Sequence, residues 1–315
     1  MKKKILIVGP PSFGYLTKIN ETLTRFKDVE STLVLIDKSS FKYKNFLQRV
    51  LNSFSKVFLN KNIKKDYLNS FLINKVKQLD KQDIIFMIRP DLLAPKTLNY
   101  LKTQTQTLTA FYYDSTRRFP KKIEILNYFD TVYSYDKLDV KAYNLEFLTN
   151  YIFDVRENVN FEQLFFNIST YDYRYQSMER LAKYIDDKQW SKEILIYGSN
   201  AIKSDCLTLI HEQIPVDNVA DKINRSKIII EIQRKDQVGL SFRVFEALGQ
   251  KKKFITTNKD IINYDFYHPQ NILVIDETTI YIPEDFVNSA YVPISNEILD
   301  KYLLKNWTKK LFELQ

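Results

Sequence analysis

The sequence contains few cysteines, histidines and glycines for its length. Its 315 residues include one cysteine, two histidines and five glycines. A single Cys206 cannot form an intrachain disulfide, and no cysteine pair has the spacing of a zinc site. With only His211 and His268 available, a histidine-rich metal centre or a Ser-His-Asp hydrolase is disfavoured. The low cysteine content is typical of a reducing compartment, so we expect a cytoplasmic protein.

Long hydrophobic runs are also absent. No run reaches the roughly 18 apolar residues that a membrane span needs. The N-terminal Met-Lys-Lys-Lys resembles the start of a signal peptide, but the apolar run at 5–8 stops at Gly9-Pro10-Pro11. That run is too short for the hydrophobic region of a signal peptide, so it predicts a buried first strand.

Size and charge place the chain among globular proteins with one basic region. A length of 315 residues with 44% hydrophobic residues suits two domains. The net charge is +9, and residues 38–81 alone hold eleven Lys or Arg against two Asp. The remainder is balanced, so the charge indicates a local partner. A nucleic acid is a weak candidate, because no nucleic-acid-binding module is recognisable.

Strand and helix patterns alternate along the whole chain. In the first half we predict strands at 5–8, 31–36, 83–88, 107–113, 130–135 and 146–151, with helical patterns at 15–26, 42–80 and 95–102. In the second half we predict strands at 193–197, 227–232, 253–256 and 271–275, and helices at 175–185, 217–224, 242–248 and 298–313. The fold class is therefore α/β, with two Rossmann-like doubly wound domains facing a cleft.

The domain boundaries follow from this alternation. We expect an N-terminal domain over 1–153 and a C-terminal domain over 154–297. A C-terminal helix over 298–315 could pack back on the N-terminal domain.

Candidate site residues directly follow the predicted strands. Open parallel sheets bind ligands beyond the carboxyl ends of their strands. In the first domain these residues are Gly9, Ser12, Gly14 and Arg89. In the second domain they are Tyr197, Gly198, Ser199, Arg234, Gln237, Thr256, Thr257 and Asn258.

The stretch 237–249 is the most informative part of the second domain. Gly239 and Ser241 permit a tight loop into a helix whose first turn would favour a phosphate. Arg243 could then bind a pyrophosphate, and Glu246 could accept hydrogen bonds from ribose hydroxyls. The alternative is structural: Ser241 is a plain N-cap, and Arg243 and Glu246 are solvated charges.

Three segments resemble a known family. They are GLSFRVFEALGQKKKFITTN at 239–258, YDFYHPQN at 264–271 and FDTVYSYDKLDVKAYNLEFL at 129–148. They resemble bacterial GT-B glycosyltransferases, especially the lipopolysaccharide-core or capsule biosynthesis proteins and the CgeB-like group. Together they cover less than a third of the chain. The resemblance implies transfer of a sugar from a nucleotide sugar to a bacterial surface polysaccharide or glycolipid. It also implies that the domain over 1–153 is the acceptor side, with the candidate residues named there, and that the domain over 154–297 binds the nucleotide-sugar donor.

One position departs from the pattern of many retaining GT-B enzymes. These carry two glutamates separated by seven residues, and if Glu246 is the second, the first falls on Val238. The stereochemistry therefore stays open. A second interpretation also stays open, in which the protein binds a nucleotide or glycan without catalysis as part of a polysaccharide assembly system.

The reaction would need a base if it inverts the sugar. We predict Asp114, directly after a strand, as that base, with Asp91 and His268 as weaker candidates. The alternative for Asp114 is a turn or helix cap at a strand end. No DxD-like metal motif stands at a strand end, so we expect no metal and no cofactor beyond the donor.

The basic region has a helical apolar pattern. Phe46, Val50, Phe54, Val57 and Phe58 recur at helical spacing, and lysines flank them. This combination fits an interfacial helix on an anionic membrane. The same apolar stripe would equally fit a helix packed on the sheet with solvated lysines.

Overall fold

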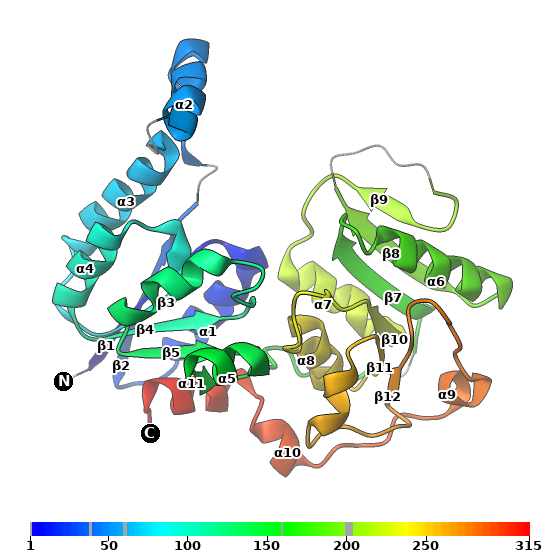
Figure 1. The fold of residues 1–315 in the computed structure, drawn as a ribbon. Coiled ribbons are helices and arrows are strands. Elements are labelled where there is room, and N and C mark those ends of the chain that lie inside the picture. Colours follow the sequence, from blue (N-terminus) through cyan, green and yellow to red (C-terminus); the bar gives the residue numbers. More distant parts are fainter. Residues whose placement is uncertain (1, 38–39, 59–61, 159, 199–203) are drawn as a thin grey trace. The chain divides into compact units, whose positions relative to one another are not determined.

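The computed structural model describes residues 2–37, 40–58, 62–158, 160–198 and 204–315, and for 56–58 it describes the backbone alone. The chain divides into two compact units, Met1–Leu148 and Thr149–Gln315 (Figure 1).

The first unit is built on a parallel sheet of six strands in the order β2-β1-β3-β4-β5-β6. The strands are β1 (Lys3–Gly9), β2 (Val29–Leu35), β3 (Gln82–Ile88), β4 (Thr105–Tyr112), β5 (Thr131–Ser134) and β6 (Glu146–Phe147). This is a doubly wound order in which the chain reverses direction across the sheet between β1 and β3. The two loops that follow those strands therefore border the expected ligand crevice.

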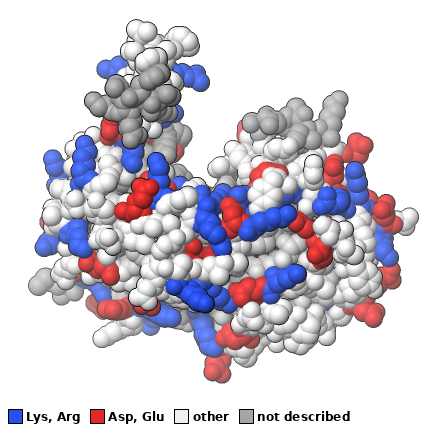
Figure 2. Space-filling view, viewed as in Figure 1, with Lys and Arg blue, Asp and Glu red and all other residues white. Residues whose placement is uncertain are grey.

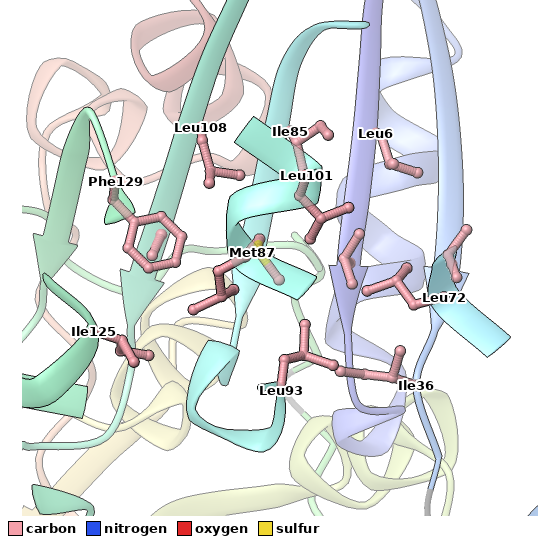
Figure 3. Packing of buried hydrophobic residues seen from close by; sticks show 14 of the residues in the cluster. Leu6, Ile36, Leu72, Ile85, Met87, Leu93, Leu101, Leu108, Ile125 and Phe129 are labelled. Carbon is pink, nitrogen blue, oxygen red and sulfur yellow. The ribbon is translucent and has the colours of Figure 1, made fainter. Parts of the chain in front are cut away.

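Helices cover both faces of this sheet. They are α1 (Tyr15–Leu23), α3 (Ile63–Val76), α4 (Pro95–Thr103) and α5 (Lys137–Tyr143), with 3-10 turns at Ser12–Gly14, Pro90–Leu92 and Pro120–Tyr128. A further helix, α2 (Phe46–Phe58), extends beyond α3 and away from the sheet (Figure 1). Leu72 of α3 and Leu101 of α4 pack against Met87 and Leu108 of the sheet in one core (Figure 3). On the opposite face Leu16 of α1 lies against Gly9, where an added Cβ would come within 2.7 Å of Leu16 Cδ1. Gly9 is thus needed for this close packing.

The second unit contains another parallel sheet of six strands, in the order β12-β11-β10-β7-β8-β9. The strands are β7 (Gln163–Thr170), β8 (Lys192–Tyr197), β9 (Thr208–Ile210), β10 (Ser226–Glu231), β11 (Lys253–Thr256) and β12 (Ile272–Val274). β7 and β10 are central neighbours, and the strand order reverses between them. The crevice at this reversal is the expected ligand site of the unit.

Helices again cover both faces. The helices of this unit are α6 (Tyr175–Asp187), α7 (Val216–Asn224), α8 (Phe242–Gly249), α9 (Glu284–Asn288), α10 (Asn296–Asp300) and α11 (Leu304–Phe312), with a 3-10 turn at Lys259–Asn263; the first four pack on the sheet. α7 and α8 share a core with Phe166, Ile229 and Phe254. α6 and α9 pack on the other face, against Phe165 and Ile228.

The prediction of one long C-terminal helix over 298–313 is wrong. The structure has two helices there, α10 and α11, separated by extended Leu303. Leu303 pairs with Ile152 as an isolated parallel bridge, and Leu304 N donates to Ile152 O at 2.8 Å. Trp307 Nε1 also donates to Thr149 O at 2.9 Å, so this end of the chain is fastened to the start of its own unit.

Most predicted strands and helices are present with small shifts of their ends. The helical pattern at 42–80 is confirmed as two helices, α2 and α3. Two strands, β7 and β9, were not predicted. The α/β class with two Rossmann-like sheets is confirmed. Among the described residues no helix combines the length and apolar content needed to cross a bilayer.

Candidate functional site

A polar pocket lies at the carboxyl edge of β10, β11 and β12 in the second unit. Its cavity volume is about 320 Å³, within the size range of small-molecule sites. It is lined by Gln233, Arg234, Lys235, Gln237, Val238, Thr257, Asn258, Lys259, Asp260, Ile275, Asp276 and Glu277. Of the predicted donor residues, Arg234, Gln237, Thr257 and Asn258 are thus brought together. Three cations, Arg234, Lys235 and Lys259, and three carboxylates, Asp260, Asp276 and Glu277, line the pocket, so the lining carries no net charge and suits a polar ligand.

The loop after β10 is held by amide and hydroxyl side chains. Gln233 N donates to Thr257 Oγ1 at 2.9 Å, and Gln233 Nε2 donates to Gly239 O at 3.0 Å. Asn258 Nδ2 donates to Val238 O at 3.0 Å. Thr256 is fully buried, and its Oγ1 accepts from Asn258 N. Thr256 and Gly239 therefore shape the loop and do not line the pocket.

Charged residues span the reversal point between β7 and β10. Asp172, just after β7, accepts from Arg234 NH1 at 2.6 Å and from Arg174 NH2 at 2.9 Å. Arg174 NH1 also donates to Ile232 O at 2.9 Å. Burial would raise the pKa of Asp172, but hydrogen bonds from Arg174 and the charges of Arg174 and Arg234 outweigh it and lower that pKa. Arg234 is thereby positioned at the pocket wall.

The start of α8 carries a buried ion pair. Ser241 Oγ accepts from Arg243 N at 3.2 Å, so Ser241 is the N-cap of the helix. Arg243 NH1 lies 2.5 Å from Glu246 Oε2, and the Glu246 side chain is 1% exposed. Glu246 is therefore not a solvated charge, and Arg243 is occupied in compensating it. Neither residue lines the pocket.

Glu231, at the end of β10, adds a second buried carboxylate to this region. Its Oε2 atom is buried and accepts no hydrogen bond from the described residues. Burial raises the pKa of Glu231, while the Ser241 hydroxyl and the charges of Arg174 and Arg243 act in the opposite direction. The edge of the second sheet thus places two carboxylates and two guanidinium groups beside the pocket-forming loop.

The remaining donor-side candidates lie at the next strand. Tyr197 ends β8, and its carbonyl accepts from Tyr171 N at 2.7 Å. A Cβ on Gly198 would come within 2.9 Å of Tyr171 Cβ, so glycine is required for this packing. Neither residue lines the pocket. Ser199 lies outside the described residues.

The acceptor-side candidates gather at the β1–β3 edge of the first unit. Ser12 Oγ lies 2.6 Å from Tyr113 OH, and Ser12 and Gly14 both have positive φ, 44° and 105°. Arg89 forms two 2.8 Å hydrogen bonds with Asp91, and its guanidinium carbon lies 3.6 Å from the centre of the Phe119 ring. The conformation of this loop is unusual for residues with side chains, and such strain is concentrated at functional sites.

Asp114 follows β4 at the same edge. Its carboxylate pairs with Arg118 NH1 at 2.5 Å, and its main-chain carbonyl accepts from Lys122 Nζ at 2.7 Å. Lys122 is 1% exposed, and burial lowers its pKa to about 8. Burial raises the pKa of neighbouring Tyr113 to about 12.

The two weaker candidates for the base also have partners. Asp91 accepts hydrogen bonds from Arg89. His268 Nδ1, in the second unit, accepts from Gln270 N.

Several charged residues at these edges were missed from the sequence. Asp172 and Arg174 follow β7, a strand that the sequence pattern does not predict, so their position at a strand end was not predictable either. Glu231 was available as the polar end of the predicted strand KIIIEI. Lys259 directly follows Asn258, the last residue proposed at that edge. In the described part of the chain no group of three or more His, Cys, Asp or Glu side chains is placed to hold a metal ion, and metal independence stays a prediction.

Comparisons with known proteins support the architecture. A scan against protein-family models and a search of curated proteins each find no match. Among solved structures, an alpha-glucosyltransferase in complex with UDP and a 13-mer DNA has a TM-score of 0.60 at 10% identity, over 100% of this chain and 99% of that chain. The UDP-forming trehalose-phosphate synthase of Burkholderia xenovorans, in complex with glucose-6-phosphate, has a TM-score of 0.59 at 11% identity, covering 98% and 99%.

A third similar structure has a different activity. The UDP-GlcNAc 2-epimerase of Methanocaldococcus jannaschii, in complex with UDP-GlcNAc and UDP, has a TM-score of 0.54 at 11% identity, covering 99% and 100%. A shared fold hosts more than one reaction, and likeness at such low identity concerns the fold alone. The chain has the GT-B fold, with two Rossmann-like domains in succession.

Proposed function

We propose that this protein is a GT-B glycosyltransferase that takes a nucleoside diphosphate sugar in its second unit. The observation that carries the proposal is the polar pocket at the β10–β12 edge, which holds Arg234, Lys235 and Lys259 beside the reversal point. Arginine and lysine side chains neutralise a diphosphate, and amide side chains give a base or ribose its hydrogen bonds. UDP is the first nucleotide to test, because all three similar structures above carry it or form it.

The residues that line the pocket and those at the start of α8 have different roles in this proposal. Arg234 and Lys259 would bind the diphosphate, and Gln237 and Asn258 the nucleoside. The Arg243–Glu246 pair would hold the start of α8 beside the loop. Direct contact of Arg243 with phosphate and of Glu246 with ribose, which the family resemblance implies, would require that pair to rearrange.

The acceptor is proposed from the family resemblance. It is a bacterial surface polysaccharide or glycolipid, bound at the first unit's edge near Ser12 and Arg89. We propose Asp114 there as the base. Arg118 shares its carboxylate in the structure, so the proposal requires the acceptor hydroxyl to reach the other carboxylate oxygen. No metal takes part in the proposed reaction.

A thermal-shift panel of UDP, GDP, CMP, dTDP and ADP sugars tests the donor site. A ligand at about 100 times its dissociation constant stabilises the folded state by about 2.7 kcal/mol. We expect one nucleotide class to do so, and we expect Arg234→Gln to weaken its binding about tenfold, since a charge-assisted hydrogen bond contributes about 1.5 to 3 kcal/mol. Lys183→Gln, on an exposed side of α6, is the matched control. No stabilisation by any nucleotide sugar contradicts the proposal.

The second candidate function, binding without catalysis, is favoured by one observation. Val238 stands where the first of the two glutamates is expected, and it lines the pocket. Release of free nucleotide in the presence of a glycan acceptor separates the two functions. Tight donor binding without release of free nucleotide in the presence of any acceptor supports the protein that binds without catalysis.

A further inference from the structure

Helix α2 turns its apolar side chains toward solvent. Phe46 is 79% exposed, Leu47 64% and Phe54 62%. With Val50 and Leu51, which are also exposed, they recur three and four residues apart and so share one side of the helix. A helix of a globular protein ordinarily directs such a side to the core. Here the stripe is displayed, and Figure 1 shows α2 extending past the end of α3, away from the sheet of its unit.

The polar side of α2 is the one that packs on the protein. Asn52 is fully buried. Its Nδ2 donates to Tyr43 OH at 2.7 Å, and its Oδ1 accepts from Ile63 N, the first residue of α3, at 2.9 Å. A buried amide satisfied on both sides fixes the rotation of the helix about its axis. The outward direction of the apolar side is therefore built into the fold.

The same segment carries charge of one sign. Residues 38–65 contain eight Lys or Arg and no Asp or Glu. Lys42, Lys44 and Arg49 are exposed around the start of α2. In Figure 2 the column at the upper left has white side chains at its outer end and blue ones on its flanks. In the described part of the segment, the surface thus combines exposed apolar side chains with the exposed cations Lys42, Lys44 and Arg49.

We propose that the exposed apolar side of α2, with the cations Lys42, Lys44 and Arg49 beside it, docks this protein on an anionic phospholipid bilayer. An apolar helix side inserts at the boundary between headgroups and acyl chains, and cations near the surface bind the anionic headgroups. A second copy of the chain fits less well as the occupant, because pairing the same segment would bring two groups of eight like charges together. The proposal concerns a surface remote in sequence from the donor pocket and holds whichever donor is bound.

Vesicle co-sedimentation of the full chain tests the docking. The probe is vesicles of phosphatidylcholine with about a third phosphatidylglycerol, compared with phosphatidylcholine alone. We expect binding to the anionic vesicles only, and its loss at about 1 M salt, where the Debye length is about 3 Å. The triple variant Phe46→Ser, Leu51→Ser, Phe54→Ser should bind at least tenfold more weakly while keeping the melting temperature of the unmodified protein, since these side chains are exposed.

A charge series supplies the matched control. Lys42→Gln, Lys44→Gln and Arg49→Gln together should abolish binding. The control changes three exposed lysines of the same unit outside the segment, Lys27, Lys96 and Lys141, to glutamine and should retain binding. An equal loss of vesicle binding in both triple variants would show that the protein is attracted by its general positive charge, and it would overturn the assignment of the docking surface to α2.

Two further results decide between occupants. Phe46→Trp should show a blue-shifted emission with anionic vesicles, because the indole enters the apolar layer. If the unmodified protein ignores anionic vesicles at low salt, the proposal is wrong. A concentration-dependent dimer that the triple serine variant dissociates, without vesicle binding, would assign the surface to a second copy instead.

Discussion

The buried pair at the start of α8 gives a quantitative prediction. Arg243→Met removes the guanidinium but keeps a side chain that reaches toward Glu246. The Glu246 side chain is 1% exposed and that of Arg243 is 15% exposed, so the variant leaves a carboxylate buried without its partner. Breaking a buried pair from one side destabilises a protein by about 3 to 5 kcal/mol. Because Arg243 keeps some contact with water, we expect the lower end, about 3 kcal/mol.

Denaturation with urea measures this directly. Trp190 and Trp307 both belong to the second unit, so intrinsic fluorescence reports the unfolding of that unit. The double variant Arg243→Met, Glu246→Gln removes both charges, and we expect it to recover most of the lost free energy of unfolding. Lys183→Met, which breaks an exposed pair 4.0 Å from Glu179, is the control and should change stability by less than about 1 kcal/mol.

Two outcomes would refute the reasoning. If Arg243→Met unfolds within about 0.5 kcal/mol of the unmodified protein, the pair does not stabilise α8. If the double variant is no more stable than Arg243→Met alone, the loss comes from packing and not from an uncompensated charge.

Three further variants test other parts of the two edges. Burial raises the pKa of Glu231 above its value in the unfolded chain. Between these two pKa values the folded state binds more protons, so the free energy of unfolding falls as pH rises through that range. Glu231→Gln should therefore be more stable than the unmodified protein at pH 7 in urea denaturation, and equal stability at all pH values contradicts this. Burial lowers the pKa of Lys122 from 10.5 to about 8. Between pH 8 and 10.5 the unfolded state binds more protons, so the free energy of unfolding should rise by about 3 kcal/mol as pH rises through that range. Lys122→Met should lack that rise, and an unchanged pH profile in this variant would show that Lys122 is not its source. Asp114→Asn should lower turnover with little effect on donor affinity, and full activity would remove Asp114 from the mechanism.

Strong apolar runs made the fold predictable. The run at 5–8 became β1 and KIIIEI became β10, because a continuous β-branched segment bounded by polar residues suits a buried parallel strand. The central strand β7 was missed, since QLFFNIST has only a short apolar run between polar residues. Its burial comes from both sides of the finished sheet, which the local sequence does not reveal. The C-terminal helix was misjudged for a similar reason, because the pairing of Leu303 with Ile152 overrides a local helical pattern.

The sequence predicted those site residues that directly follow a predicted strand, and it did not predict contacts between residues distant in sequence. Placing residues after strands located Arg234, Gln237, Thr257 and Asn258 at one pocket. The Asp172–Arg234 pair joins residues 62 positions apart, so no local pattern could indicate it. Likewise, the sequence of α2 showed an apolar stripe without its direction. The direction depends on the buried Asn52, a contact made only in the folded protein.

Photo-crosslinking with an azido-substituted UDP-sugar tests the central claim most directly, because it reports where a donor binds. The account predicts that the label maps to peptides covering 232–239 or 257–260, that unlabelled UDP competes it away, and that Arg234→Gln reduces it about tenfold. Specific labelling confined to residues 1–148, or no labelling that a nucleotide competes, would contradict a donor site at the β10–β12 edge.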